Sequence, residues 1–137
     1  MKKFNLIDHT ADVRLFVQAD SQQELFLAAL QGMAEIISPT SCHTNKSMIT
    51  HIIKINSHDP TVLLIDFLSE ALTLSHVYKA LFCSATFTIL TPNQLEALVH
   101  GIPVAQFDED IKAVTYHEAE IIHDNQGNLS TMIVFDI

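Results

Sequence analysis

The feature that most constrains this fold is a wide apolar stripe in the middle of the chain. Its residues recur at the spacing of a helix face: Leu63, Leu64, Phe67, Leu68, Ala71 and Leu74. Asp59 followed by Pro60 supplies a helix cap and a proline at the first helical position, where no amide hydrogen is needed. We therefore expect a helix from Pro60 to about residue 76, the more buried of two.

The other helix is predicted to begin at Ser21. Ser21 and Glu24 have the spacing of a capping box, in which each side chain satisfies the other residue's backbone amide. Apolar residues then follow at helical spacing: Leu25, Ala28, Ala29, Met33, Ile36 and Ile37. Pro39 ends this helix, and the polar residues 40–47 are predicted to form a loop.

The remaining segments have the composition and alternation of β-strands. The predicted strands cover residues 4–19, 49–55, 81–90, 95–100, 112–123 and 129–137. Residues 101–103 are interpreted as a strand break, and residues 125–128 as a hairpin turn. The predicted fold class is therefore α+β: a single domain over residues 1–137, with two helices packed on a mainly antiparallel sheet.

Charge and length narrow the function classes. The 137 residues suit one domain, and the formal net charge of −9 opposes stable, direct binding to nucleic acid. No secretion signal is recognised and no apolar run approaches the ~20 residues of a membrane span. We therefore expect a cytoplasmic protein without membrane contact.

Cys42 and Cys83 fit neither a C-x-x-C nor a zinc-ligand pattern, and both are expected to be reduced.

Acidic residues gather near both ends of the chain. Asp8, His9 and Asp12 lie at the first bend, and Asp136 precedes Ile137. If the last strand pairs with the first, Asp12, Asp136 and the carboxylate of Ile137 converge. Hard oxygen ligands of this kind suit calcium, magnesium or manganese. The alternative is that these aspartates form turns and a solvated strand end.

The segment from Lys112 to His117 is the second candidate for chemistry. A lone lysine and a lone histidine suit a phosphate ligand and an acid or base; the alternative is a strand with polar outward positions. The sequence has no nucleophile elbow, phosphate-binding glycine loop or zinc-ligand pair. The pattern therefore favours a protein that is not itself an enzyme.

Four blocks, in order along the chain, resemble the archease family. They are Asp8-His9-Thr10-Ala11-Asp12, residues 63–70, residues 112–117 and Phe135-Asp136-Ile137. The resemblance implies an α+β fold with an inserted strand-helix-strand-strand module. It also implies a cofactor protein for RtcB-type RNA ligases, which join RNA ends in tRNA splicing and RNA repair with GTP and a divalent metal. Such a protein promotes guanylylation and repeated turnover of the ligase.

The resemblance also implies a role for three residues. The family's metal site falls on Asp12, Asp136 and Ile137, with calcium as the first choice and magnesium or manganese as alternatives. From their own placement in the sequence, we interpret His9, Lys112 and His117 as candidate contacts to the ligase or its nucleotide.

This chain departs from the family pattern outside the metal positions. Arg14 stands where a small residue is common, Ser69 stands where Asn is frequent, and the stretch at residues 101–111 is shorter than in the family. The shorter stretch bears on the shape of a partner-facing loop. Two other function classes stay open: a chaperone-like protein-binding module and a metal-dependent hydrolase.

Overall fold

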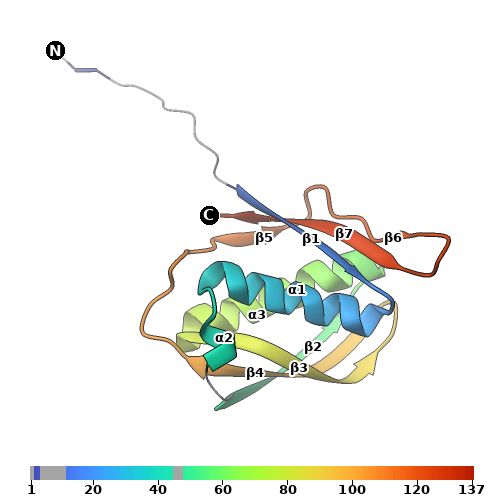
Figure 1. Cartoon of the computed structure of the whole chain (residues 1–137), viewed down its shortest axis with the longest axis horizontal. Coiled ribbons are helices and arrows are strands. Elements are labelled where there is room, and N and C mark those ends of the chain that lie inside the picture. The colour runs from blue at the N-terminus through green and yellow to red at the C-terminus, as the bar shows by residue number, and fades with distance from the viewer. Residues whose placement is uncertain (1, 4–11, 45–47) are drawn as a thin grey trace.

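The computed structural model describes residues 2–3, 12–44 and 48–137. Its elements, in chain order, are β1 (Asp12–Ala19), α1 (Gln22–Ile37), α2 (Ser41–Thr44), β2 (Ile49–Asn56), α3 (Pro60–Tyr78), β3 (Ala80–Leu90), β4 (Gln94–Pro103), β5 (Ala113–Thr115), β6 (Ile122–His123) and β7 (Leu129–Asp136) (Figure 1).

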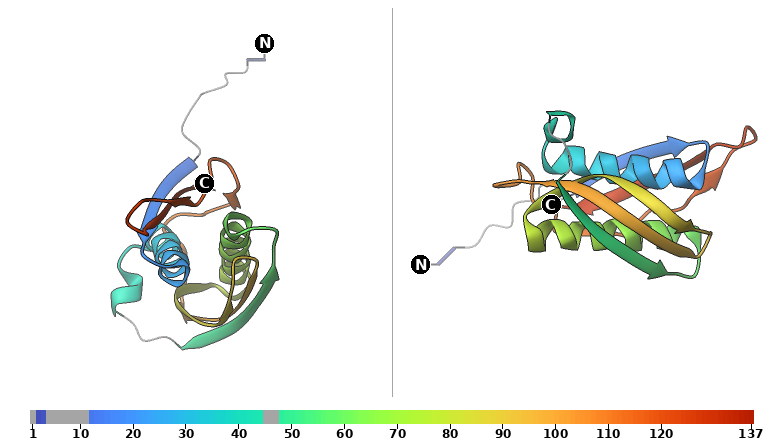
Figure 2. Two further views of the ribbon diagram at one scale, coloured as in Figure 1. Left: turned by 90° about the vertical axis from the view of Figure 1, so that its right-hand side faces the viewer. Right: turned by 90° about the horizontal axis from the view of Figure 1, so that it is seen from below.

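The two long helices lie between two antiparallel sheets (Figure 2). The terminal sheet, formed by the first strand and the last three, has the order β1-β7-β5, with β6 also paired to β7. The inserted sheet has the order β2-β4-β3. The α+β class is confirmed, and β2-α3-β3-β4 is the expected strand-helix-strand-strand module. The single sheet of the prediction is in fact two sheets that cover opposite sides of the helices.

Both long helices begin where the sequence predicts. The Ser21 hydroxyl accepts a hydrogen bond from the Glu24 amide at 3.2 Å, and the Asp59 carboxylate accepts one from the Val62 amide at 2.9 Å. These bonds satisfy amides that have no partner inside the helix. Helix α3 ends at Lys79, which takes the left-handed conformation with φ of 50°.

Both long helices contribute to the core: seven of the 16 residues of α1 and eight of the 19 residues of α3 are buried, so the expectation that α3 is the more buried helix is wrong. The position of α3 between the sheets buries more than one face, including the consecutive residues Leu63, Leu64 and Ile65. Phe67 stacks on Phe26 of α1, with ring centroids 6.0 Å apart. In the described part of the chain, only α3 is long and apolar enough to cross a membrane, and its burial between two sheets accounts for that composition.

The predicted strand break at residues 101–103 is wrong. Gly101 lies inside β4, between Ile49 of β2 and Phe82 of β3. A Cβ at Gly101 would lie 2.5 Å from the Leu81 carbonyl oxygen, so the glycine is needed for close approach of the backbones. Beside it, the register of β3 shifts between Phe82 and Ser84, which leaves Cys83 as the extra residue of a β-bulge.

The predicted strand over residues 112–123 is also interrupted. Of this segment, only β5 and β6 pair with β7. A turn separates them, in which the Ala119 amide donates to the Tyr116 carbonyl at 3.1 Å. Glu118 adopts a φ of 62°, which no extended strand contains. Lys112 and His117 therefore lie outside the strands, and alternation does not fix their directions.

The expectation that both cysteines are reduced is wrong in this structure. Cys42 and Cys83 form a disulfide with an S–S distance of 2.04 Å. Residues 40–47 were expected to be a loop, but Ser41–Thr44 form the short helix α2, which presents Cys42 toward β3. A bond between residues 41 positions apart depends on tertiary folding, which spacing in the sequence does not reveal.

Candidate functional site

Asp12 and Asp136 lie directly opposite each other on neighbouring strands. The antiparallel register of β1 and β7 pairs Asp12 with Asp136 and Val13 with Phe135 (Figure 1). Because Phe135 is fully buried and side chains alternate along a strand, both carboxylates point to the outer face of the terminal sheet. Opposite residues on one face have Cβ atoms about 4.5–5.5 Å apart. The pairing on which the predicted convergence depends is therefore confirmed.

Two carboxylates in this position repel each other, and Arg14 offsets part of that repulsion. Arg14 lies two residues after Asp12 on the same face, and its Nη2 is 3.6 Å from Asp12 Oδ2. The pair is open to solvent, with side chains 47% and 30% exposed, so water and salt weaken the attraction. Arg14 is thus an internal counter-ion at the position where the sequence departs from the archease pattern.

Glu118 holds the same guanidinium from the other side. Arg14 Nε donates to Glu118 Oε2 at 3.0 Å, and Nη2 lies 3.4 Å from Oε1, so the contact is two-pronged. This hydrogen bond raises the pKa of Arg14 and lowers the pKa of Glu118. The Arg14–Glu118 contact connects the turn after β5 with β1, beside the two aspartates.

Lys112 and Ile137 complete the corner around Asp136. The Lys112 amide donates to the Asp136 carbonyl at 2.7 Å, immediately before β5 pairs Ala113 with Asp136. Ile137 is partly buried and packs against the core, which holds the residue after Asp136 in place. The Lys112 side chain is exposed at this edge.

The two candidate histidines are placed differently. His117 is exposed next to Glu118, and its amide donates to the Thr115 hydroxyl at 3.3 Å. It is therefore connected to Asp12 through Glu118 and Arg14 rather than by direct contact. His9 lies outside the described residues, as does Asp8.

The donor atoms at this corner are of the chemical type that a hard divalent cation binds. Asp12, Asp136 and Ile137 offer only oxygen atoms, which calcium, magnesium and manganese prefer. Among the residues that the structure describes, no group of three or more His, Cys, Asp and Glu side chains is placed to hold a metal. A cation here would accordingly take two carboxylates and complete its shell with main-chain oxygen and water.

Asp66 forms a second polar cluster that sequence reasoning missed. On the otherwise apolar α3, its carboxylate accepts hydrogen bonds from the Tyr116 hydroxyl and from the Ser57 hydroxyl, the latter at 2.8 Å. The bond to Asp66 raises the pKa of Tyr116. Asp66 thus connects the end of β5 with the segment before α3. Its signal in the sequence was an acidic residue between the apolar residues Ile65 and Phe67.

Comparison with known proteins identifies relatives across nearly the whole chain. A sequence model of the Archease protein family matches residues 4–137. The archease of Methanosarcina mazei is 26% identical, over 99% of this chain and 97% of that protein. The archease of Sulfurisphaera tokodaii is 29% identical, over 93% of each.

Two solved structures have a similar fold. Protein 1598 of Methanobacterium thermoautotrophicum superposes with a TM-score of 0.74 at 23% identity, covering 96% of each chain. A Thermotoga maritima protein, described as an archease and possible chaperone, gives a TM-score of 0.71 at 19% identity. That match covers 100% of this chain and 99% of the other.

Proposed function

Since the chain belongs to the archease family, we propose that it is an accessory protein of an RtcB-type RNA ligase and that it works through a bound divalent cation. The observation that carries the metal part is the register of β1 and β7, which sets Asp12 opposite Asp136 on one outer face. Such a pair is unfavourable until a positive charge neutralises it.

Asp12, Asp136 and the main-chain oxygens of Ile137 would hold the cation. Calcium is the first choice because it accepts irregular sets of oxygen ligands, whereas magnesium demands near-ideal octahedral geometry. The cation supplies a positive charge, which phosphate oxygens bind, at the edge of an otherwise acidic protein. Lys112, next to Asp136, and His117, next to Glu118, flank this corner as contacts to the ligase or its nucleotide.

The overall charge supports a basic protein partner. A net charge of −9 repels a phosphate backbone and attracts the positively charged surface on which an RNA ligase binds its substrate. Association with the ligase should therefore slow as salt is added, because exposed charges are screened over about 8–10 Å at 0.10–0.15 M. The chain would act on the ligase without holding RNA itself.

The decisive experiment measures ligase guanylylation and turnover. The ligase, GTP, manganese and RNA ends are mixed with and without a substoichiometric amount of this protein, at limiting nucleotide. We expect faster guanylylation and several turnovers per ligase only when the protein is present. Asp12→Asn and Asp136→Asn keep the side-chain shape and remove one charge each, and both should lose the effect.

Asp20→Asn is the matched control. Asp20 is exposed and directly follows β1, so the same charge is removed at the far end of that strand, about 26 Å from Asp12. Equal ligase turnover with and without the protein contradicts the activator role. Equal loss in all three variants contradicts the role of the corner. Turnover of phosphoesters by the chain alone would instead favour a metal-dependent hydrolase.

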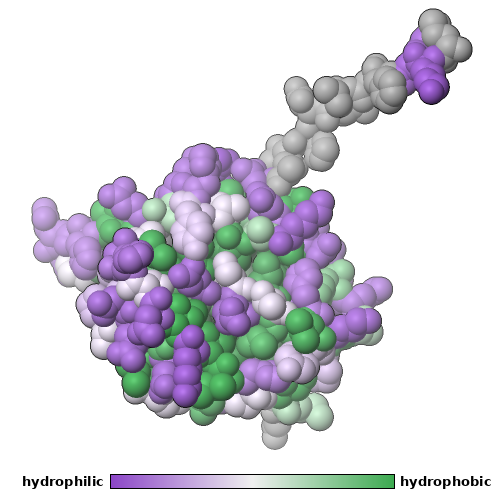
Figure 3. All heavy atoms as spheres, turned by 180° about the vertical axis from the view of Figure 1, so that it is seen from behind, coloured by the Kyte–Doolittle hydropathy of each residue, from purple (hydrophilic) through white to green (hydrophobic). Residues whose placement is uncertain are grey.

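A chaperone-like role is the second candidate, because the surface carries exposed apolar side chains. Met48, Ile52, Val77 and Tyr78 are each more than half exposed, and Tyr78 stacks on His51 with ring centroids 4.2 Å apart. Figure 3 shows hydrophobic patches between hydrophilic side chains on one face. Suppression of aggregation of an unfolded client, lost in Met48→Ser and Val77→Ser but retained in Asp12→Asn, would favour this role.

A further inference from the structure

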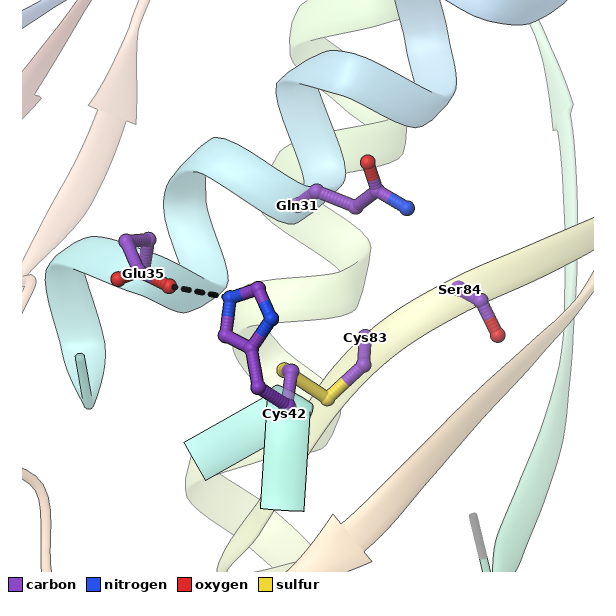
Figure 4. A pocket seen from close by; sticks show the side chains of 6 residues that line it. Gln31, Glu35, Cys42, Cys83 and Ser84 are labelled. Carbon is purple, nitrogen blue, oxygen red and sulfur yellow. Dashed lines mark ion pairs between the residues drawn. A yellow bond between two sulfur atoms is a disulfide. The ribbon is translucent and has the colours of Figure 1, made fainter. Parts of the chain in front are cut away.

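The Cys42–Cys83 disulfide borders a surface cavity between α1, α2 and β3 (Figure 4). The cavity has a volume of about 350 Å³, and its walls are Gln31 and Glu35 of α1, Cys42 and His43 of α2, and Cys83 and Ser84 of β3. Both cysteines are only partly buried. A small molecule can therefore reach the sulfur atoms without unfolding of the protein.

The two cysteines lie in different local structures at the wall of this cavity. His43 directly follows Cys42, and its Nε2 lies 3.7 Å from Glu35 Oε2 (Figure 4). Cys83 is the extra residue of the β-bulge, and the bulge turns it out of the regular strand pairing.

The position of the bond argues against a purely structural role. A domain of 137 residues with this buried core does not need a covalent link to fold. The bond joins a four-residue helix to a strand at the surface, instead of crossing the core. The cytoplasmic location expected from the sequence stays a prediction, and in that compartment of mesophilic cells disulfides are usually transient and either catalytic or redox-sensing.

We propose that Cys42–Cys83 is a reversible thiol–disulfide exchange site for small thiols of the glutathione class. The thiolate of one external thiol attacks Cys83 Sγ, forming a mixed disulfide, and Cys42 leaves as a thiolate. A second external thiolate attacks the external sulfur and releases Cys83. Two external thiols are thereby oxidised to their disulfide, and the two electrons and two protons end on Cys42 and Cys83.

Reduction affects the connection between α2 and the inserted sheet. It removes the covalent link between α2 and β3. The residue at the end of α1, Ile37, accepts hydrogen bonds from the amides of Asp108 and Glu109 at 2.9 and 3.2 Å. The segment that leads to Lys112 is thus attached to the end of α1, shortly before α2 begins.

The test follows the disulfide under native conditions. The purified full chain is incubated at several ratios of reduced to oxidised glutathione, free thiols are alkylated, and the intact mass is measured. We expect two alkylated cysteines at high ratios of reduced to oxidised glutathione and none at low ratios. The fraction alkylated at each ratio should be the same whether the protein starts oxidised or reduced. Far-UV circular dichroism should stay that of the folded protein throughout. A disulfide that opens only after denaturant is added would overturn the proposal, as would thiols that stay reduced at every ratio.

Two bulky substitutions test the cavity as the route of attack. Ser84→Phe fills the cavity and should slow reduction by glutathione at least fivefold. Thr88→Phe adds the same ring at an exposed position further along β3 and should leave the rate unchanged. If Ser84→Phe does not fold, Gln31→Phe blocks the same cavity from the exposed side of α1. Equal rates in the blocked and control variants would overturn the assigned route.

Discussion

Replacing both cysteines with serine should cost a large part of the stability of this protein. The disulfide closes a loop with a sequence separation of 41 residues, which restricts the unfolded chain. Chain-entropy arguments give about 4 kcal/mol at 25 °C for a loop of this size. Residual structure in the unfolded chain lowers this figure, so we expect a loss of about 2–4 kcal/mol. At about 3 °C per kcal/mol, the melting temperature should fall by roughly 6–12 °C.

The measurement is urea unfolding of the wild type and of the Cys42→Ser/Cys83→Ser variant, each with and without a strong reductant. The reduced wild type should unfold at the same urea concentration as the variant, because both lack the cross-link. The reductant should not change the variant. A difference below about 1 kcal/mol between oxidised wild type and variant would refute the reasoning, because it would mean that the bond does not restrict the unfolded chain.

Three further predictions concern the corner and the bulge. Arg14→Gln removes the internal counter-ion of Asp12 and should raise cation affinity up to about fivefold in calorimetry, the range of an exposed ion pair; unchanged affinity would contradict this role. Glu118→Gln should lower the melting temperature at neutral pH. Because Arg14 lowers the pKa of Glu118, its contribution is present above the unfolded value of about 4.5 and is lost as pH falls through the folded value. The two melting curves should therefore converge in acid, and a constant difference would argue against the pair. Gly101→Ala should destabilise by more than about 1 kcal/mol in urea unfolding, since the new Cβ meets the Leu81 carbonyl; wild-type stability would show that the strands can separate.

The local features of the fold were predictable because their causes are local. Each of the caps at Ser21 and Asp59 joins residues three positions apart in the sequence. The wide apolar stripe of α3 indicates a helix that is covered on more than one side. The division into two sheets was not predictable in this way. Which strand pairs with which depends on contacts between distant residues, and each strand alone shows only alternation.

The candidate site shows the same limit. The sequence predicts that Asp12 and Asp136 lie close together only if the first and last strands pair. The structure shows that they do pair. Arg14 was recognised as a departure from the archease pattern, but its partner Glu118 lies 104 residues away in a turn that alternation had assigned to a strand. The Cys83 bulge depends on Gly101 in a neighbouring strand, which was interpreted as a break.

The position of β7 has a consequence for the order in which this protein assembles during synthesis. The inserted sheet is built from β2, β3 and β4, which are consecutive strands, so it can form while the rest of the chain is still being made. The terminal sheet cannot, because β7 lies between β1 and β5 and is the last of these elements to be synthesised. Until then β1 has no partner strand. A chain that stops short of β7 therefore has neither a closed terminal sheet nor the opposed carboxylates of Asp12 and Asp136.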